Sequence, residues 1–131
     1  MMRIVCVGNL VHDEVFRVGA LPSSGIKTGV LDYESRFGGP AATAAVAIAR
    51  LGGRAAYWGR VGQDDAGREA LRLMQASGVD CSGVAQLPAG RTLRAIVLVD
   101  ARGERSIVSD RRSLAPDPAV LPGDPLDGTA A

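Results

Sequence analysis

A glycine-rich turn that runs directly into a helix of small apolar residues constrains this chain more than any other feature. Gly38 and Gly39 close an extended run, Pro40 follows them, and residues 42–51 carry no charge before Arg50. Because glycine has no Cβ, backbone here can approach a ligand closely, and proline suits a first helical position. The pattern predicts a helix that is buried on most sides and aims its positive end at a glycine-lined space. It fits both a small-molecule site and a plain tight turn before a core helix.

Composition and charge exclude several classes of protein. The 131 residues, 47% hydrophobic and 22% charged, suit one globular domain with a real core. The formal net charge is +1 and the basic residues are spread out, so we expect neither nucleic acid nor a membrane as partner. Two cysteines and one histidine without metal-ligand spacing predict no metal site. Reduced thiols, no apolar run near ~20 residues and no signal-peptide layout predict a cytoplasmic location.

Hydrophobic periodicity divides the chain into strands and helices. Buried-type strands alternate with helices, which predicts a parallel sheet covered on both faces. Two further strand pairs alternate apolar and polar residues loosely and predict a separate small sheet. Gly59 is expected to end a strand, and residues 100–103 to form a hairpin turn. The expected strands are residues 3–7, 14–18, 28–37, 54–58, 92–99 and 105–108, and the second helix runs from Asp64 or Asp65 to Ser77.

Polar side chains ahead of the glycine-rich turn are candidates for ligand contact. Asp13 follows the predicted strand end at Gly8, where parallel-sheet proteins place ligand-binding residues. Its carboxylate suits two adjacent hydroxyls of a polyol, and a turn or cap is the alternative reading. Lys27, the only lysine, either neutralises an anionic substrate group or is simply solvated. His12 has no convincing partner and is interpreted as a surface or packing residue.

A second glycine-rich segment, residues 59–67, also follows a predicted strand. It has neither the G-x-G-x-x-G spacing nor the G-x-x-x-x-G-K-[ST] spacing of nucleotide-binding loops. A shaped strand-to-helix turn is therefore the better interpretation. Asp64 and Asp65 are expected at the helix start rather than on a metal. A small nucleotide-binding protein is accordingly the least supported alternative.

Several short motifs occur in a telling order. They are Val7-Gly8 then Asp13, Leu21-Pro22 then Gly25, Phe37-Gly38-Gly39-Pro40-Ala41-Ala42-Thr43, Arg50-Leu51-Gly52, Gly59-Arg60-Val61-Gly62-Gln63-Asp64, Gly78-Val79-Asp80, and Asp100 to Gly103-Glu104-Arg105. This order resembles the ribokinase-like (PfkB) family of carbohydrate kinases from residue 3 to about residue 110. Within that family, the Gly-Gly-Pro-Ala-Ala-Thr stretch is most similar to sulfofructose kinase and fructokinase-like members.

The resemblance implies a fold, a reaction and a set of sugar contacts. The fold is a three-layer α/β/α sandwich with a small β lid, and the reaction transfers the ATP γ-phosphoryl group, with Mg²⁺, to a sugar hydroxyl. Asp13 matches the aspartate that holds sugar hydroxyls, and Gly38 and Gly39 match the di-glycine under the sugar. Thr43 falls where most members have asparagine, a change that the sulfofructose-like members share.

The lid adds further implied contacts. Lys27 lies there and is suited to a sulfonate or phosphate end, while Ala95 and Val97 are at positions that touch substrate through side-chain bulk. The expected ligand is a sugar, such as a ketohexose or its sulfonated or phosphorylated form. A homodimer through the lid is the expected assembly.

The family's downstream Gly-Ala-Gly-Asp motif, which carries the catalytic base, has no counterpart among these residues. Residues 1–113 are therefore expected to form the N-terminal half of such a kinase, with lid strands at about 9–37 and 92–109. Residues 114–131 are expected to form a disordered tail rich in proline and glycine. The chain is then expected to hold no catalytic residue, to bind ATP and Mg²⁺ poorly, to be inactive alone, and to expose an aggregation-prone sheet edge. A stand-alone sugar-binding or oligomerisation module without catalysis is the alternative.

Overall fold

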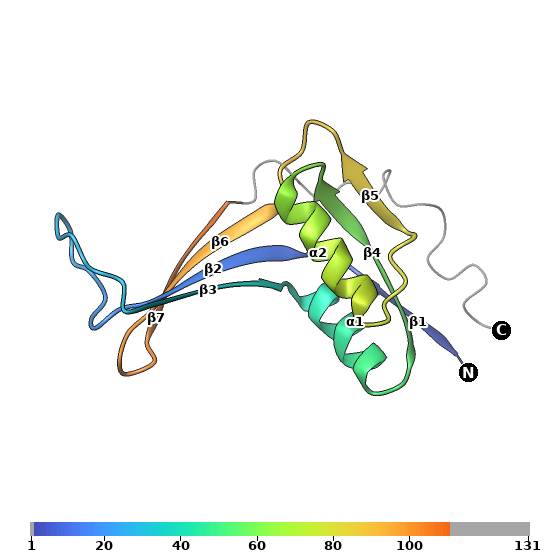
Figure 1. Cartoon of the computed structure of the whole chain (residues 1–131), viewed down its shortest axis with the longest axis horizontal. Helices are drawn as coiled ribbons and strands as arrows, with labels where there is room; N and C mark the ends of the chain where they lie inside the picture. The colour runs from blue at the N-terminus through green and yellow to red at the C-terminus, as the bar shows by residue number, and fades with distance from the viewer. Residues whose placement is uncertain (1, 111–131) are drawn as a thin grey trace.

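The structure, a computed structural model, describes residues 2–110 and arranges them as two sheets and two helices (Figure 1). One sheet is parallel, with strand order β1-β4-β5, and the other has the order β3-β2-β6-β7 and extends away from the helices. The strands are β1 (Arg3–Val7), β2 (Val11–Arg17), β3 (Asp32–Gly38), β4 (Arg54–Gly62), β5 (Val84–Leu87), β6 (Leu93–Val99) and β7 (Arg105–Asp110). The helices are α1 (Pro40–Arg50) and α2 (Asp65–Ala76).

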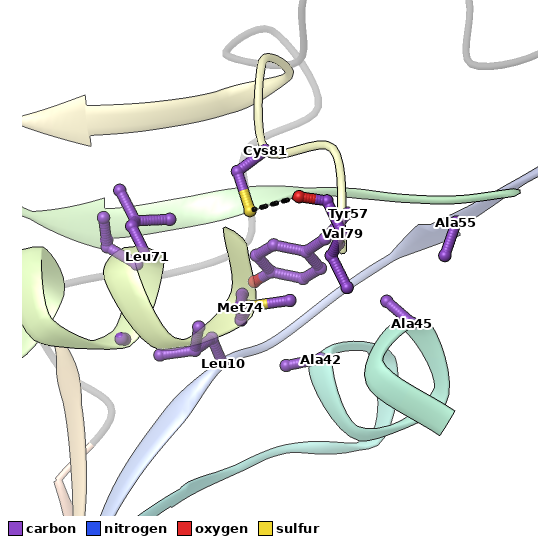
Figure 2. Close-up of a cluster of buried hydrophobic side chains, with 11 residues drawn as sticks. Leu10, Ala42, Ala45, Ala55, Tyr57, Leu71, Met74, Val79 and Cys81 are labelled. Carbon is purple, nitrogen blue, oxygen red and sulfur yellow. Dashed lines mark hydrogen bonds between the residues drawn. The ribbon is translucent and has the colours of Figure 1, made fainter. Parts of the chain in front are cut away.

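Both helices cover the same face of the parallel sheet. The strand order β1-β4-β5 advances in one direction, and right-handed crossovers in one direction place their helices on one side. Ala45 of α1, Met74 of α2 and Tyr57 of β4 accordingly meet in a single buried cluster (Figure 2). The expectation of helices on both faces is not met within residues 2–110, which supply the sheet and one helical layer of the predicted sandwich.

The helix α1 is less enclosed than its composition suggests. Only Ala42 and Ala45 are fully buried, whereas Thr43, Ala44 and Ala47 are exposed. Alanine is small enough to face either solvent or a packed neighbour, so a run of alanines does not by itself report how many sides are covered. The prediction of burial on most sides is therefore wrong for the described part of the chain.

The second sheet confirms the predicted small separate sheet, called the lid below. Its central strand β2 pairs antiparallel with β3 and parallel with β6, which in turn pairs antiparallel with β7. The strand β2 begins at Val11 rather than at residue 14, so that Asp13 lies inside a strand and not in a loop. Val15, Ala95 and Val97 form the buried cluster of this sheet.

Two features of the parallel sheet differ from the expected pattern. The strand β4 continues to Gly62 instead of ending at Gly59. At Gly59 a Cβ would clash with the Tyr57 hydroxyl and the Gly8 carbonyl oxygen, so this glycine permits a close approach rather than a chain reversal. The short strand β5 was not predicted, because four residues carry too little periodicity.

Several expected signals for helix starts and turns are confirmed. Pro40 occupies the first turn of α1, and Asp64 caps α2 by accepting a hydrogen bond from the Gly67 amide at 2.8 Å. The Gly103 amide donates to the Asp100 carbonyl oxygen in the predicted hairpin turn. The predicted tail, residues 114–131, lies outside the described residues. No helix within residues 2–110 is long and apolar enough to cross a membrane.

Tyr57 joins the parallel sheet to the chain that leads into the lid. Its ring is fully buried, and its hydroxyl donates to the Gly8 carbonyl oxygen at 2.9 Å. Burial raises the pKa of this hydroxyl, which keeps it protonated as a donor. We expect Tyr57→Phe to lower the free energy of unfolding by about 1–2 kcal/mol, because the Gly8 carbonyl loses its partner.

Urea unfolding followed by Trp58 fluorescence measures this loss. The control is Tyr33→Phe, since Tyr33 lies on the lid and is half exposed. It is expected to change stability by less than about 0.5 kcal/mol. Equal effects of the two substitutions would contradict a specific role for the Tyr57 hydroxyl.

Candidate functional site

Three predicted site residues meet where the lid joins the parallel sheet. Asp13 of β2 pairs in register with Ala95 of β6, and Val11, two residues earlier, pairs with Gly38 of β3. Paired residues and residues two apart lie on one face of a sheet, so Asp13, Ala95 and Gly38 share a face. A Cβ added at Gly38 would come within 2.8 Å of Asp13 Oδ2. The carboxylate therefore lies directly against the glycine backbone, in space that any other residue would fill.

Gly39 serves a different purpose from Gly38. Its φ is +97°, in the left-handed region that favours glycine, and a Cβ there would clash with the Asn9 carbonyl oxygen. Two of the connections between the sheets, β1 to β2 and β3 to α1, thus pass each other at this residue without a side chain between them. Gly39 is also the N-cap of α1, and no side chain caps the helix there. The di-glycine therefore sets both the crossing of the chains and the space beside Asp13.

The Asp13 carboxyl is partly dehydrated, and the net shift of its pKa is upward. Burial raises its pKa, and the nearby charges of Arg36 and His12 oppose that rise. Arg36 lies directly opposite Asp13 in the β2–β3 register. No hydrogen bond contributes to the pKa shift, so the oxygen atoms keep acceptor capacity. Such a carboxylate is suited to accept hydrogen bonds from ligand hydroxyl groups.

The two lid residues implied to touch substrate lie on the same face as Asp13. Ala95 and Val97 are 6% and 7% exposed and pack with Val15. In this position they contribute apolar bulk beside the carboxylate and no polar contact. Lys27 is placed elsewhere: it is exposed in the loop between β2 and β3, which Figure 1 shows at the end of the lid remote from the helices. The structure does not bring Lys27 to Asp13.

Thr43 lies close to the di-glycine in sequence but lines a different space. Its amide donates to the Gly39 carbonyl oxygen at 2.9 Å, as expected in a first helical turn. Its side chain is exposed and lines a groove of about 690 Å³ between α1 and α2, together with Ser35, Arg36 and Phe37 of β3. Only Arg36 belongs to both this groove and the surroundings of Asp13.

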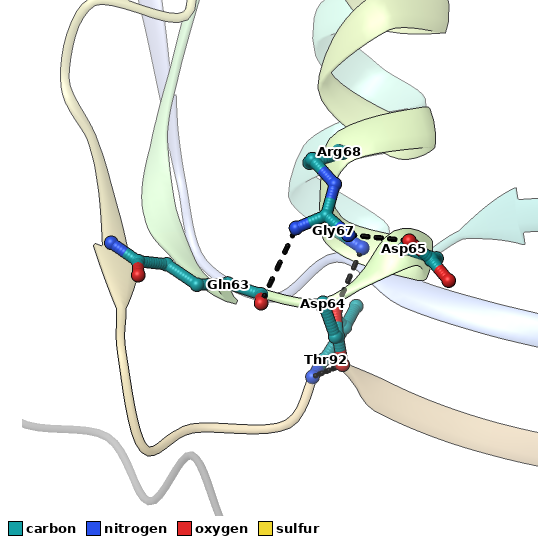
Figure 3. A network of polar contacts seen from close by, with 6 residues as sticks. All are labelled: Gln63, Asp64, Asp65, Gly67, Arg68 and Thr92. Carbon is teal, nitrogen blue, oxygen red and sulfur yellow. Dashed lines mark hydrogen bonds and ion pairs between the residues drawn. The ribbon is translucent and has the colours of Figure 1, made fainter.

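A second polar centre, which sequence reasoning recognised only as a helix cap, joins Asp64 to Thr92 (Figure 3). The Thr92 amide donates to Asp64 Oδ2 at 2.9 Å, and the Thr92 hydroxyl donates to Asp64 Oδ1 at 2.6 Å. The two residues are 28 positions apart, so no local pattern reveals the contact. The only sequence signal for this centre was the position of Asp64 at the predicted start of the second helix.

The described residues were compared with what ATP and a metal ion require. Within residues 2–110, no three His, Cys, Asp or Glu side chains gather in a way that could hold a metal ion. The N-terminus of α2 already receives the Asp64 carboxylate, which would repel a phosphate. We therefore assign no step of phosphoryl transfer to these residues.

Comparison with known proteins relates this geometry to a family. The chain matches the family described as pfkB family carbohydrate kinase over residues 1–118. It is 34% identical over 110 residues to an ATP-dependent ribose-1-phosphate kinase of Halopiger xanaduensis, covering 84% of this chain and 37% of that kinase. It is 41% identical over 78 residues to fructokinase-1 of Oryza sativa subsp. japonica, covering 60% of this chain and 24% of the fructokinase. The chain thus spans well under half the length of these relatives.

Solved structures agree with the sequence matches. A ribokinase of Cryptococcus neoformans in complex with ADP superposes with a TM-score of 0.70 at 28% identity, covering 84% of this chain and 34% of that protein. A fructokinase of Xylella fastidiosa gives a TM-score of 0.70 at 30% identity, covering 88% of this chain and 35% of that protein. The ribokinase-like fold is confirmed. Because the family match extends over all of residues 2–110, it follows that this chain belongs to the pfkB family of carbohydrate kinases.

Proposed function

We propose that this chain supplies the sugar-binding part of an ATP-dependent carbohydrate kinase. The observation that carries the proposal is the Asp13 carboxylate, which lies against Gly38 and opposite Ala95 with free acceptor capacity. The family match supports sugar phosphorylation as the activity of the whole protein. Because the match covers 37% of the Halopiger kinase, the part assigned to this chain is to bind and orient the sugar.

The geometry suits a polyol more than a flat or purely apolar ligand. A partly dehydrated carboxylate accepts hydrogen bonds from two adjacent hydroxyl groups, and a ligand that lacks one of them leaves a costly unpaired acceptor. Gly38 lets the sugar ring approach the backbone, and Ala95 offers an apolar contact for its C–H groups. The names of the two relatives differ in the sugar, so they support the ligand class rather than one compound.

A ketohexose, or its phosphorylated or sulfonated form, is the ligand we propose. Thr43 replaces the asparagine of most family members with a shorter hydroxyl donor, and it lies four residues after Gly39 at the start of α1. Lys27 is the residue we assign to an anionic end of the ligand, which requires its loop to fold toward the site. Asp13 and Gly38 support the proposal more strongly than Thr43 and Lys27, because Asp13 and Gly38 already lie against each other.

Replacing Asp13 by asparagine tests the site. We expect Asp13→Asn to weaken the binding of D-fructose and D-ribose by at least about tenfold, since the amide accepts less strongly and its NH₂ group clashes with one hydroxyl donor. Isothermal titration calorimetry on the full 131-residue chain measures the change. Glu14→Gln is the matched control, because Glu14 is the next residue and points to the opposite face. Equal loss in both variants would contradict the assignment.

The same measurement repeated against pH gives an independent check. Since burial raises the pKa of Asp13, the carboxylate takes up a proton at a somewhat higher pH than an ordinary aspartate. Affinity is therefore expected to be full above that pKa and to fall as the pH drops through it. Binding by Asp13→Asn should show no such step, and a step of the same size in this variant would assign the effect to another group.

A sugar-binding module without catalysis is the second candidate, and the absence of a cluster of three metal-ligating side chains within residues 2–110 favours it. A coupled assay for ADP release, with fructose or ribose as acceptor, examines the isolated chain. We expect sugar binding but no sugar-dependent turnover. Turnover that disappears in Asp13→Asn would contradict both the module and the restriction of this chain to sugar binding.

We also propose that the chain forms a homodimer through the outer face of the lid. Tyr33, Ile96 and Val108 are 52%, 44% and 70% exposed and lie on the face opposite to Asp13. Sedimentation velocity is expected to show a dimer that Ile96→Lys dissociates, because a charge would be buried there. Ile107→Lys is the control, since Ile107 is also an exposed isoleucine, at 59%, but lies on the other face of the lid. A monomeric wild type, or dissociation by Ile107→Lys alone, would contradict this interface.

A further inference from the structure

Within residues 2–110, three chain segments connect the lid to the parallel sheet and its helices. Residues 8–10 lead from β1 into β2, and residues 38–39 lead from β3 into α1, both next to Asp13. The third segment follows β5 and enters the lid at Thr92, immediately before β6. Thr92 is a polar residue only 2% exposed, so its hydrogen bonds hold the buried base of this strand.

Every polar group of Thr92 except its carbonyl is bound to one corner of the parallel sheet and α2 (Figure 3). Its amide and hydroxyl both donate to the Asp64 carboxylate, at 2.9 and 2.6 Å. Its hydroxyl oxygen accepts from the Gly62 amide, at the end of β4, at 3.1 Å. Asp64 Oδ1 also accepts from the Gly67 amide in the first turn of α2. One carboxylate and one hydroxyl thus connect β4, α2 and β6.

Backbone packs closely around this contact at two glycines, Gly62 and Gly67. A Cβ at Gly67 would clash with the Gly62 carbonyl oxygen and lie 2.9 Å from Thr92 Oγ1. A Cβ at Gly62 would clash with the Gly90 carbonyl oxygen. The start of β6 is thus held at Thr92 by hydrogen bonds to Asp64 and Gly62, and loss of these bonds is expected to loosen β6.

Movement of β6 reaches the ligand site directly. Leu93, the residue after Thr92, pairs with Val11, and Ala95 pairs with Asp13. A strand advances about 3.3 Å per residue, so Thr92 lies only about 10 Å along the strand from Ala95. The position of Thr92 therefore sets the position of Ala95 and, through the β2–β6 ladder, of the Asp13 carboxylate.

We propose that Asp64 and Thr92 are positioning residues that fix the lid over the sugar site without touching the sugar. The proposal rests on the proposed function for its ligand. The state of Asp64 supports it: burial alone would raise the pKa of this carboxyl, but hydrogen bonds from Thr92 and Gly67 outweigh burial and lower it, with a smaller contribution from Arg94. Asp64 is thus ionised at neutral pH and serves as a permanent charged acceptor.

Hydrogen exchange on the unliganded 131-residue chain separates positioning from general stability. Thr92→Val removes the hydroxyl and keeps the shape, and Thr92→Ser restores the hydroxyl. We expect the amides of β2 and β6 to exchange about tenfold faster in Thr92→Val, and Thr92→Ser to stay close to wild type. The amides of β4 are expected to be unchanged except that of Gly62, which loses its acceptor in Thr92→Val. Equal acceleration in both sheets, or none in the lid, would overturn the proposal.

Asp65→Asn is the matched control for a lost carboxylate at the start of α2. The Asp65 side chain is fully exposed and pairs only with Arg68 on its own helix. Asp65→Asn is expected to leave hydrogen exchange in the lid unchanged, whereas Asp64→Asn should accelerate this exchange as Thr92→Val does. Acceleration of the same size in Asp65→Asn would assign the effect to the charge at the helix terminus and overturn a specific contact.

Calorimetry with D-fructose supplies the functional readout. Sugar affinity is expected to fall roughly tenfold in Thr92→Val and to recover in Thr92→Ser. Unchanged affinity in a variant whose lid amides exchange faster would overturn the positioning role. If the wild-type chain binds no sugar, the proposed function fails, while the exchange pattern still decides whether Asp64 and Thr92 hold the lid.

Discussion

The close crossing of two chain connections at Gly39 is the constraint on which the rest of the structure depends. The chain leaves the parallel sheet after β1, builds two strands of the lid, and returns to start α1 beside its point of departure. The return is possible because Gly39 adopts a left-handed conformation and has no Cβ to meet the Asn9 carbonyl oxygen. The same crossing places Gly38 under Asp13, so the ligand site follows from the way in which the two sheets are joined.

Two carboxyl groups at the lid boundary, Asp13 and Asp64, have pKa values that their surroundings shift in opposite directions. Asp13 is partly dehydrated and its pKa is raised, because burial dominates and no hydrogen bond offsets it. The pKa of Asp64 is lowered, because three hydrogen bonds from Thr92 and Gly67 outweigh burial. The first keeps its acceptor capacity for a ligand, and the second uses it to hold the protein together. This division supports a binding role for Asp13 and a positioning role for Asp64.

Local signals in the sequence account for much of the fold. The β-branched run of β1, the cap of α2 at Asp64 and the turn at Gly103 were all predictable, because each depends on neighbouring residues. The strand order was not predictable in this way, and with it the placement of both helices on one face, since crossover direction depends on which strands pair. The continuation of β4 beyond Gly59 was missed because this glycine accommodates Tyr57 and Gly8, which are distant contacts.

The candidate site likewise contains residues that local motifs reveal and a contact between distant residues that they do not. Asp13, Gly38 and Gly39 were found from motif order, and the structure brings Gly38 against Asp13 while Gly39 lies against Asn9. The contact between Asp64 and Thr92 spans 28 positions, so no periodic pattern in the sequence reveals it.

A structure of the chain with a bound ketohexose tests the proposed sugar site at Asp13 most directly. Our account predicts both Asp13 carboxylate oxygens within hydrogen-bond distance of adjacent sugar hydroxyls, with the ring over Gly38. A sugar bound in the groove between α1 and α2, away from Asp13, would contradict it.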